Sequence, residues 1–211
     1  MQNYNLSFIS NENIYAHVKE TVLKYKTFID LKTFNSNVID PIKLTFDAKV
    51  YGKSLEEIIE SECVRQIDKG NTNHIGYFHQ NLFKYAGNGW EVPTAGFDVV
   101  NEEQHIYCIL KNSIDRMTNR QKLCVMIQMN DKLLQDKEAI CLIVDRTDKS
   151  FTYTPWEWKD SEGIVHSNNR IFYASIDKLY ELIFGDNDAY TKMLKILPNI
   201  IDDVLIDNHN E

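Results

Sequence analysis

The feature that most constrains the fold of this chain is a continuous apolar run from Ala139 to Val144. The run has the length of a β-strand, and an uninterrupted apolar strand is typical of one that is covered on both faces. A helix is predicted just before it, over 119–135, because apolar residues recur there at helical spacing. A buried strand next to a long helix indicates a sheet with helices packed on its faces.

The remaining patterns predict an α/β protein with a mixed central β-sheet flanked by helices. Further helices are expected over 11–25, 41–50, 54–68, 74–85, 176–184 and 188–205, and further strands over 97–100, 105–110, 151–158 and 170–174. Ser54 and Glu57 form a capping box that begins the third of these helices, and Gly70-Asn71 is expected to end it. Pro198 is expected to interrupt the last helix. No internal repeat or low-complexity linker divides the chain, so one domain is expected over 1–211.

The composition bears on location and on partners. No apolar run approaches the roughly 18 residues that cross a bilayer, and the N-terminus has neither the basic nor the apolar region of a secretion signal. These features predict a cytoplasmic protein without a membrane partner. The 31 acidic residues outnumber the 23 basic ones and give a net charge of −8, which opposes non-specific coating of nucleic acid. Net charge averages over both faces, however, and leaves room for a local basic cleft.

The cysteines and two histidines give no sign of a metal site. None of the four cysteines forms a CxxC pair, and each sits among apolar neighbours, so buried free thiols in a reducing compartment are expected at Cys63, Cys108, Cys124 and Cys141. His74 and His79 are five residues apart in a predicted helix, which puts them on different faces and disfavours joint metal binding.

The residues most suggestive of chemistry lie in the predicted hairpin of 97–100 and 105–110. Asp98 lies in the first strand, and Lys111 follows the second on the same face as residue 109, because side chains alternate along a strand. Many Mg²⁺-dependent nucleases place an aspartate on one strand, and an acid, one residue and a lysine on the next. The two carboxylates and a main-chain carbonyl bind Mg²⁺. The lysine orients or helps to deprotonate the attacking water and stabilises charge on the phosphate.

In this chain the second acid is missing, because Ile109 stands at its position. A lone Asp98 is expected to bind a divalent ion weakly, and Lys111 lacks its nearest counter-charge. Ile109 is expected to face a cleft, because its neighbours in the strand form the apolar side. The pattern by itself also fits an ordinary β-hairpin with solvated ends.

Segments along nearly the whole chain resemble the type II restriction endonucleases that recognise GGNCC, a family of the PD-(D/E)xK nuclease superfamily. They are Ser54–Lys69, Asn73–Phe83, Gly89–Pro93, Gly96–Asn101, Ser175–Tyr180 and Leu197–Asp203. In that family a glutamate stands at the position of Ile109. The pair Lys111-Asn112 follows the family, whereas most of the segment from Ser113 to Lys122 departs from it.

The resemblance implies a restriction-endonuclease-like fold and Mg²⁺-dependent cleavage of double-stranded DNA at GGNCC within a restriction-modification system. It implies Asp98 and Lys111 as catalytic residues, Asp98 as the metal ligand, and a homodimer with one catalytic centre per subunit on a near-palindromic site. With Ile109 in place of the acid, cleavage is expected to be impaired. Two alternatives stay open: a DNA-binding protein that does not cleave, and a protein that keeps only the fold. No residue is singled out for reading bases.

Other acids near the motif are weaker candidates for the missing ligand. Glu62 is the strongest of them, because a helix before the sheet can lend a carboxylate to sites of this type, and Glu60 shares that helix. Asp115 lies just past the lysine. For all three, a solvated surface position is the simpler interpretation. Glu102 and Glu103 belong to the turn, which is expected at the wrong end of the hairpin.

An aromatic group near the end of the sheet allows two interpretations. Tyr153, Trp156 and Trp158, followed by Lys159, could stack on DNA or border it. Aromatic residues that alternate along a strand more often belong to the core, which is the interpretation that we favour.

Overall fold

The computed structural model describes residues 3–210 of the chain, which divides into two compact units. Residues 1–19 and 78–211 form the first unit, and residues 20–77 form the second. The helices are α1 (Asn11–Lys24), α2 (Leu31–Ser36), α3 (Pro41–Tyr51), α4 (Leu55–Leu82), α5 (Asn119–Gln135), α6 (Ile176–Phe184) and α7 (Ala189–Asn210), with a short 3₁₀ turn, η1 (Phe83–Tyr85). Across the described residues, no helix is both long and apolar enough to span a bilayer. One domain over 1–211 stays a prediction, which a single cooperative transition in a thermal melt would support.

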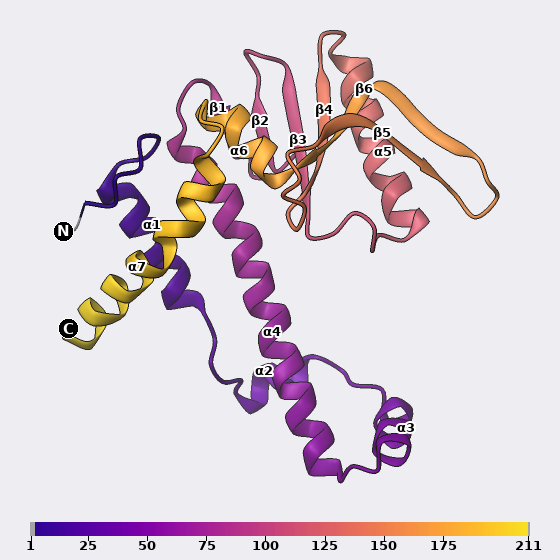
Figure 1. Cartoon of the computed structure of the whole chain (residues 1–211). Helices are drawn as coiled ribbons and strands as arrows, with labels where there is room; N and C mark the ends of the chain where they lie inside the picture. The colour runs from indigo at the N-terminus through magenta and orange to yellow at the C-terminus, as the bar shows by residue number, and fades with distance from the viewer. Residues whose placement is uncertain (1–2, 211) are drawn as a thin grey trace. The chain divides into compact units, whose positions relative to one another are not determined.

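The first unit is built on a mixed sheet, as predicted, and this sheet has six strands (Figure 1). In spatial order its strands are β1 (Trp90–Glu91), β2 (Val99–Asn101), β3 (Ile106–Lys111), β4 (Ile140–Asp145), β6 (Val165–Ser175) and β5 (Tyr153–Lys159). β4 runs parallel to β3 and to β6, whereas the outer pairs are antiparallel. The apolar run of the sequence is therefore an internal strand of the sheet.

Helices cover both faces of this sheet, which confirms the second part of the fold prediction. α5 makes the crossover that the parallel strands β3 and β4 require, and it buries Met126 and Met129 against Ile109 and Ile143. A capping box fixes its first turn, as the side chain of Thr118 and that of Gln121 each bond the other's backbone N–H. On the other face, α6 and β4 together line a small apolar pocket, and α7 packs on α6.

The second unit is helical, and each helix that begins in it has a side-chain cap. Asp30 and Asp40 accept hydrogen bonds from backbone N–H groups in the first turns of α2 and α3. At the start of α4, the Ser54 N–H donates to Glu57 Oε2 at 2.7 Å, and the Glu57 N–H donates to Ser54 Oγ at 3.2 Å. The capping box predicted at this position is confirmed.

The prediction that Gly70-Asn71 ends a helix is wrong, because α4 continues through both residues as one 28-residue helix. A single glycine inside a helix costs only about 1 kcal/mol relative to alanine. Asn71 also has another role: it accepts a hydrogen bond from the Lys26 N–H at 2.9 Å and donates one to the Lys26 carbonyl at 3.0 Å. Its polar side chain thus fastens a neighbouring segment instead of ending the helix.

The prediction that Pro198 interrupts the last helix is also wrong, because Pro198 lies inside α7 and the helix continues through it. A proline in a helix interior removes one backbone hydrogen bond and crowds the preceding turn. Apolar residues on both sides of it are almost fully buried, namely Met193 at 2% exposure and Ile200 and Val204 at 0%. Burial on both sides of the proline holds the two halves of α7 in one helix. The short elements α2 and β1 were not predicted.

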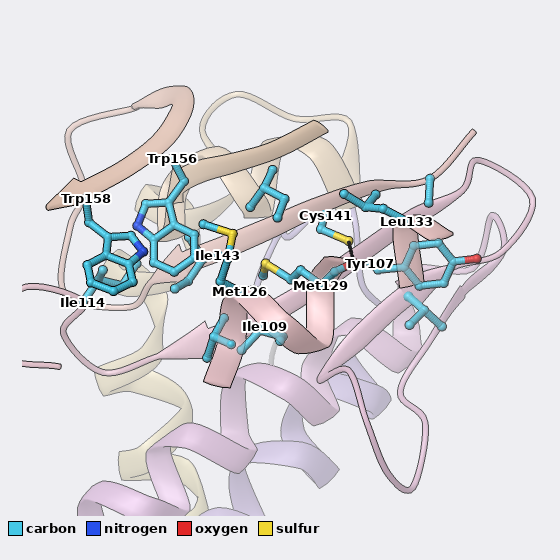
Figure 2. Packing of buried hydrophobic residues seen from close by; sticks show 14 residues of the cluster. Tyr107, Ile109, Ile114, Met126, Met129, Leu133, Cys141, Ile143, Trp156 and Trp158 are labelled. Carbon is cyan, nitrogen blue, oxygen red and sulfur yellow. Dashed lines mark hydrogen bonds between the residues drawn. The ribbon is translucent and has the colours of Figure 1, made fainter. Parts of the chain in front are cut away.

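The aromatic residues of β5 are divided between core and surface. Trp156 and Trp158 are buried in the same cluster as the apolar side of α5, which confirms the core interpretation for these two residues (Figure 2). Tyr153 is 42% exposed and stacks on Phe172, with ring centroids 4.9 Å apart. The four cysteines are free thiols, as predicted, but the prediction that all of them are buried is wrong: Cys108 and Cys141 are buried, whereas Cys63 is half-buried and Cys124 is exposed.

Candidate active site

Asp98 is fixed at the open end of the hairpin formed by β2 and β3. Its backbone N–H donates to the Cys108 carbonyl at 2.9 Å, and its carboxylate oxygen Oδ2 accepts from the Leu110 N–H at 2.7 Å. The side chain thus takes the place of a strand carbonyl and continues the ladder beside the last residues of β3. This brings Asp98 to the strand end that carries Lys111, and Lys111 acts electrostatically on the carboxylate.

On balance, the surroundings of Asp98 disfavour its ionised form. The second oxygen, Oδ1, accepts from Gln80 Nε2, which the last turn of α4 supplies. Burial raises the pKa of Asp98 above its usual value, although the Leu110 N–H, Lys111, Arg146 and Gln80 each act to lower it. Both carboxylate oxygens are therefore already hydrogen-bonded, and the proton is held more tightly than in water.

Ile109 does not face a cleft, and the expectation that it does is wrong. The alternation along β3 is as predicted, because Ile109 lies on the opposite face of the strand from its neighbours. The face that carries Ile109, however, is covered by α5. Its side chain is 3% exposed and belongs to the core cluster that includes Val125, Met126 and Ile143 (Figure 2). Alternation along a strand indicates on which face a side chain lies, but not what covers that face. Here the face is covered by α5, and its position over Ile109 depends on contacts between residues that no local pattern includes.

Lys111 lies where that buried face reaches solvent. It is half-buried and lines a cleft of about 350 Å³ together with residues of α5 and of the segment before it. The other lining residues are Met117, Arg120, Gln121, Cys124, Val125 and Gln128. Gln128 donates to the Gly96 carbonyl at 2.9 Å and so ties α5 to the loop that leads to Asp98.

Two charged residues beside Lys111 were missed by the sequence analysis. Asp145, the last residue of β4, is paired in register with Lys111. It is 5% exposed, and it accepts from the Ile114 N–H at 2.8 Å and from the N–H and hydroxyl of Thr147, each at 2.8 Å. Its carboxylate therefore hydrogen-bonds both the segment after β3 and the segment after β4. Arg146 follows it, is half-buried and acts on Asp98.

A signal for these residues was present in the sequence. Asp145 and Arg146 directly follow the predicted apolar strand, and the ends of neighbouring parallel strands lie at one edge of a sheet. The pairing of β3 with β4 was not predicted, so their position beside Lys111 could not be inferred. Gln80 lies in a segment that resembles the restriction endonucleases, but no local pattern directs its side chain to Asp98.

Comparison with known proteins identifies the family. Residues 6–206 match the model of the Eco47II restriction endonuclease family. The chain belongs to this family. It is 32% identical to the type II restriction enzyme Eco47II of Escherichia coli, over 95% of this chain and 88% of that enzyme. It is 26% identical to the type II restriction enzyme Sau96I of Staphylococcus aureus, over 96% of this chain and 82% of that enzyme.

The residues at the Eco47II-family site do not fit a Mg²⁺ ion. Mg²⁺ prefers an octahedron of oxygen ligands with one or two carboxylates among them. Asp98 offers one carboxylate with both oxygens hydrogen-bonded, and position 109 offers a buried methyl and ethyl group. Among the residues that the structure describes, no three His, Cys, Asp or Glu side chains come together to hold a metal.

The other acids considered as substitutes have surroundings of their own. Glu62 belongs to the second unit, where its carboxylate accepts from Arg65 Nε at 2.6 Å and from Gln66 Nε2 at 3.0 Å. The Arg65 guanidinium lowers the pKa of Glu62, so this acid is a committed ion-pair partner. Glu60 and Asp115 are exposed, as the surface interpretation has it, whereas that interpretation is wrong for Glu62, whose side chain is only 8% exposed. Glu102 and Glu103 lie in the turn before β3, whereas Lys111 is the last residue of that strand.

The neutral isostere of Asp98 is expected to be well tolerated in the Eco47II-family fold. In Asp98→Asn, the amide oxygen still accepts from the Leu110 N–H, and no charge has to be desolvated. We expect unfolding free energy within about 1 kcal/mol of the parent, whereas Asp98→Ala leaves the buried Leu110 N–H unpaired and costs about 1–3 kcal/mol. Urea denaturation near neutral pH measures both, with the exposed Asp115→Asn as control. Equal losses in both Asp98 variants would show that the carboxylate charge, paired with Lys111 or Arg146, stabilises the fold.

Proposed function

We propose that this chain is a DNA-binding member of the type II restriction endonuclease family whose double-strand cleavage is impaired. The observation that carries the proposal is the buried Ile109 at the position where the family resemblance places an acid. A lone carboxylate leaves most of the octahedral positions of a Mg²⁺ ion to water. Without a well-held ion, the attacking water and the phosphate lack the charge stabilisation that this class of cleavage requires.

The DNA substrate follows from family membership, and the finer properties follow from the resemblance. A GGNCC site is nearly palindromic, so a homodimer with two-fold symmetry is the assembly that matches it. The expected setting is a restriction-modification system in the cytoplasm. Lys111 is the residue that we expect to contact a backbone phosphate, and Asp98 is the residue that we expect to approach a divalent ion if one binds.

Cleavage and binding of one duplex, measured side by side, test this proposal. The duplex carries one GGNCC site, and the control duplex carries the same bases with the site scrambled. We expect tighter binding of the GGNCC duplex and no product in a single-turnover reaction with Mg²⁺ or Mn²⁺. Product formation at GGNCC that is lost in Lys111→Ala would show an active nuclease, and the variant excludes a contaminating enzyme. Equal binding of both duplexes would contradict site recognition.

A further inference from the structure

The cleft beside Lys111 is lined by two cationic side chains and by no carboxylate. Lys111 closes β3, and Arg120 lies in the first turn of α5. The neutral lining residues are Met117, Gln121, Cys124, Val125 and Gln128. Among the described residues, neither cation has an acid within 4.0 Å, since all the ion pairs found there involve other side chains.

A third cation reinforces the positive charge at this edge of the sheet. Arg146 follows β4, directly beside Lys111: its backbone N–H donates to the Lys111 carbonyl at 2.8 Å. Its side-chain Nε is buried and has no hydrogen-bond partner among the described residues. An unpaired guanidinium nitrogen in a partly buried position is an uncommon and costly arrangement. Three cations, Lys111, Arg120 and Arg146, thus lie at the edge of the sheet that carries two carboxylates, Asp98 and Asp145.

Two features of the sequence produce this charge balance. A glutamate at position 109 would place a carboxylate on the face shared with Lys111, whereas Ile109 adds no charge there. Arg120 lies within the segment from Ser113 to Lys122, where the chain departs from the family resemblance. Two carboxylates repel a phosphate unless a divalent cation lies between them, and a site with one carboxylate fewer repels a phosphate less.

We propose that the cleft binds a phosphate of the DNA backbone directly, through Lys111 and Arg120, without a divalent cation. The proposal rests on the proposed function, that the chain binds DNA. An arginine offers two parallel N–H donors to phosphate oxygens and a lysine offers a compact ammonium, so the pair supplies both geometry and charge. The site therefore recognises the same phosphodiester chemistry as a nuclease site but holds it by direct contact.

Fluorescence anisotropy of the GGNCC duplex, in EDTA and in Mg²⁺, tests the proposal. We expect the two dissociation constants to agree within about two-fold, because Mg²⁺ then only competes weakly as a counterion. Lys111→Gln and Arg120→Gln are each expected to weaken binding about ten-fold. Each is also expected to reduce the slope of log K against log salt concentration by about one. Lys122→Gln removes the same charge from α5 outside the cleft lining, and it should change neither quantity.

A second probe separates this inference from the proposed function. Inorganic phosphate, compared with chloride at equal ionic strength, is expected to raise the melting temperature of the parent and of Lys122→Gln, but not of Arg120→Gln. DNA binding that requires a divalent cation overturns the inference and leaves DNA binding intact. Absence of DNA binding together with specific stabilisation by phosphate supports the cleft and refutes the proposed function. Variants that match Lys122→Gln in both assays overturn the inference.

Discussion

Replacing Ile109 with glutamate is expected to destabilise the protein strongly and not to restore cleavage. The side chain is 3% exposed and packs under α5, so Ile109→Glu would bury a carboxylate among Val125, Met126 and Ile143. An unpaired buried charge costs on the order of 3–5 kcal/mol. Lys111 lies two residues away on the same face, but reaching it would require the new side chain to leave the cluster. The sequence analysis alone, with residue 109 at a cleft, would instead predict a stable variant.

Urea denaturation and a cleavage assay of the same variant decide between these views. Ile109→Val is the matched control, because it removes one methylene group without adding charge and costs about 0.5–1.5 kcal/mol. The loss in Ile109→Glu should shrink as the pH falls, because burial raises the pKa of an added carboxyl and protonation removes its charge. A variant as stable as the parent that cuts GGNCC would show that one residue separates this chain from an active nuclease.

Acid is expected to destabilise the first unit through His79. This residue of α4 hydrogen-bonds through Nδ1 to the Tyr180 hydroxyl at 2.9 Å. Burial lowers its pKa from 6.5 to about 3, and the charges of Arg146 and His17 act in the same direction. The unfolded chain therefore binds a proton at a higher pH than the folded one. The contribution of neutral His79 to the free energy of unfolding is therefore fully present above pH 6.5, and it is lost as the pH falls from there towards 3.

The size of this effect is large for one side chain. Each pH unit within that window corresponds to about 1.4 kcal/mol, and some contact with solvent reduces the value. We therefore expect about 2–3 kcal/mol to be lost through His79 between pH 6.5 and pH 4. The comparison is with His79→Gln, which can still bond the Tyr180 hydroxyl but does not titrate. If urea denaturation gives both proteins the same pH dependence, His79 is not the group that senses acid.

Local patterns were enough to predict much of the fold. The bounds of α5 and α6 were predicted correctly, because apolar spacing and end signals agree in both helices. The patterns failed where distant contacts decide, as in α4, where Asn71 binds Lys26, and in α7, where burial carries the helix through Pro198. In both cases a residue that usually ends helices is overruled by interactions that no local window contains.

The candidate site, like the fold, was predictable where residues close in the sequence determine it. The hairpin brings Asp98 near Lys111 through neighbouring backbone pairs, so spacing was sufficient to infer it. What covers Ile109, and which cations surround Asp98, depend on the pairing of β3 with β4 and on the path of α5. Arg146, which acts on Asp98, directly follows β4, and Arg120, which lines the cleft with Lys111, belongs to α5, so the places of both could be seen only in three dimensions.

The uneven burial of the cysteines gives this protein a native attachment point for a spectroscopic label. Only the thiolate form of a cysteine attacks alkylating reagents, and burial raises the pKa of Cys108 and raises that of Cys141 to about 12. Cys124 is exposed and lies in the wall of the cleft with Lys111 and Arg120. With Cys63 replaced by serine, a maleimide dye would react at Cys124 and place a fluorophore next to whatever enters the cleft, with no residue of the core disturbed.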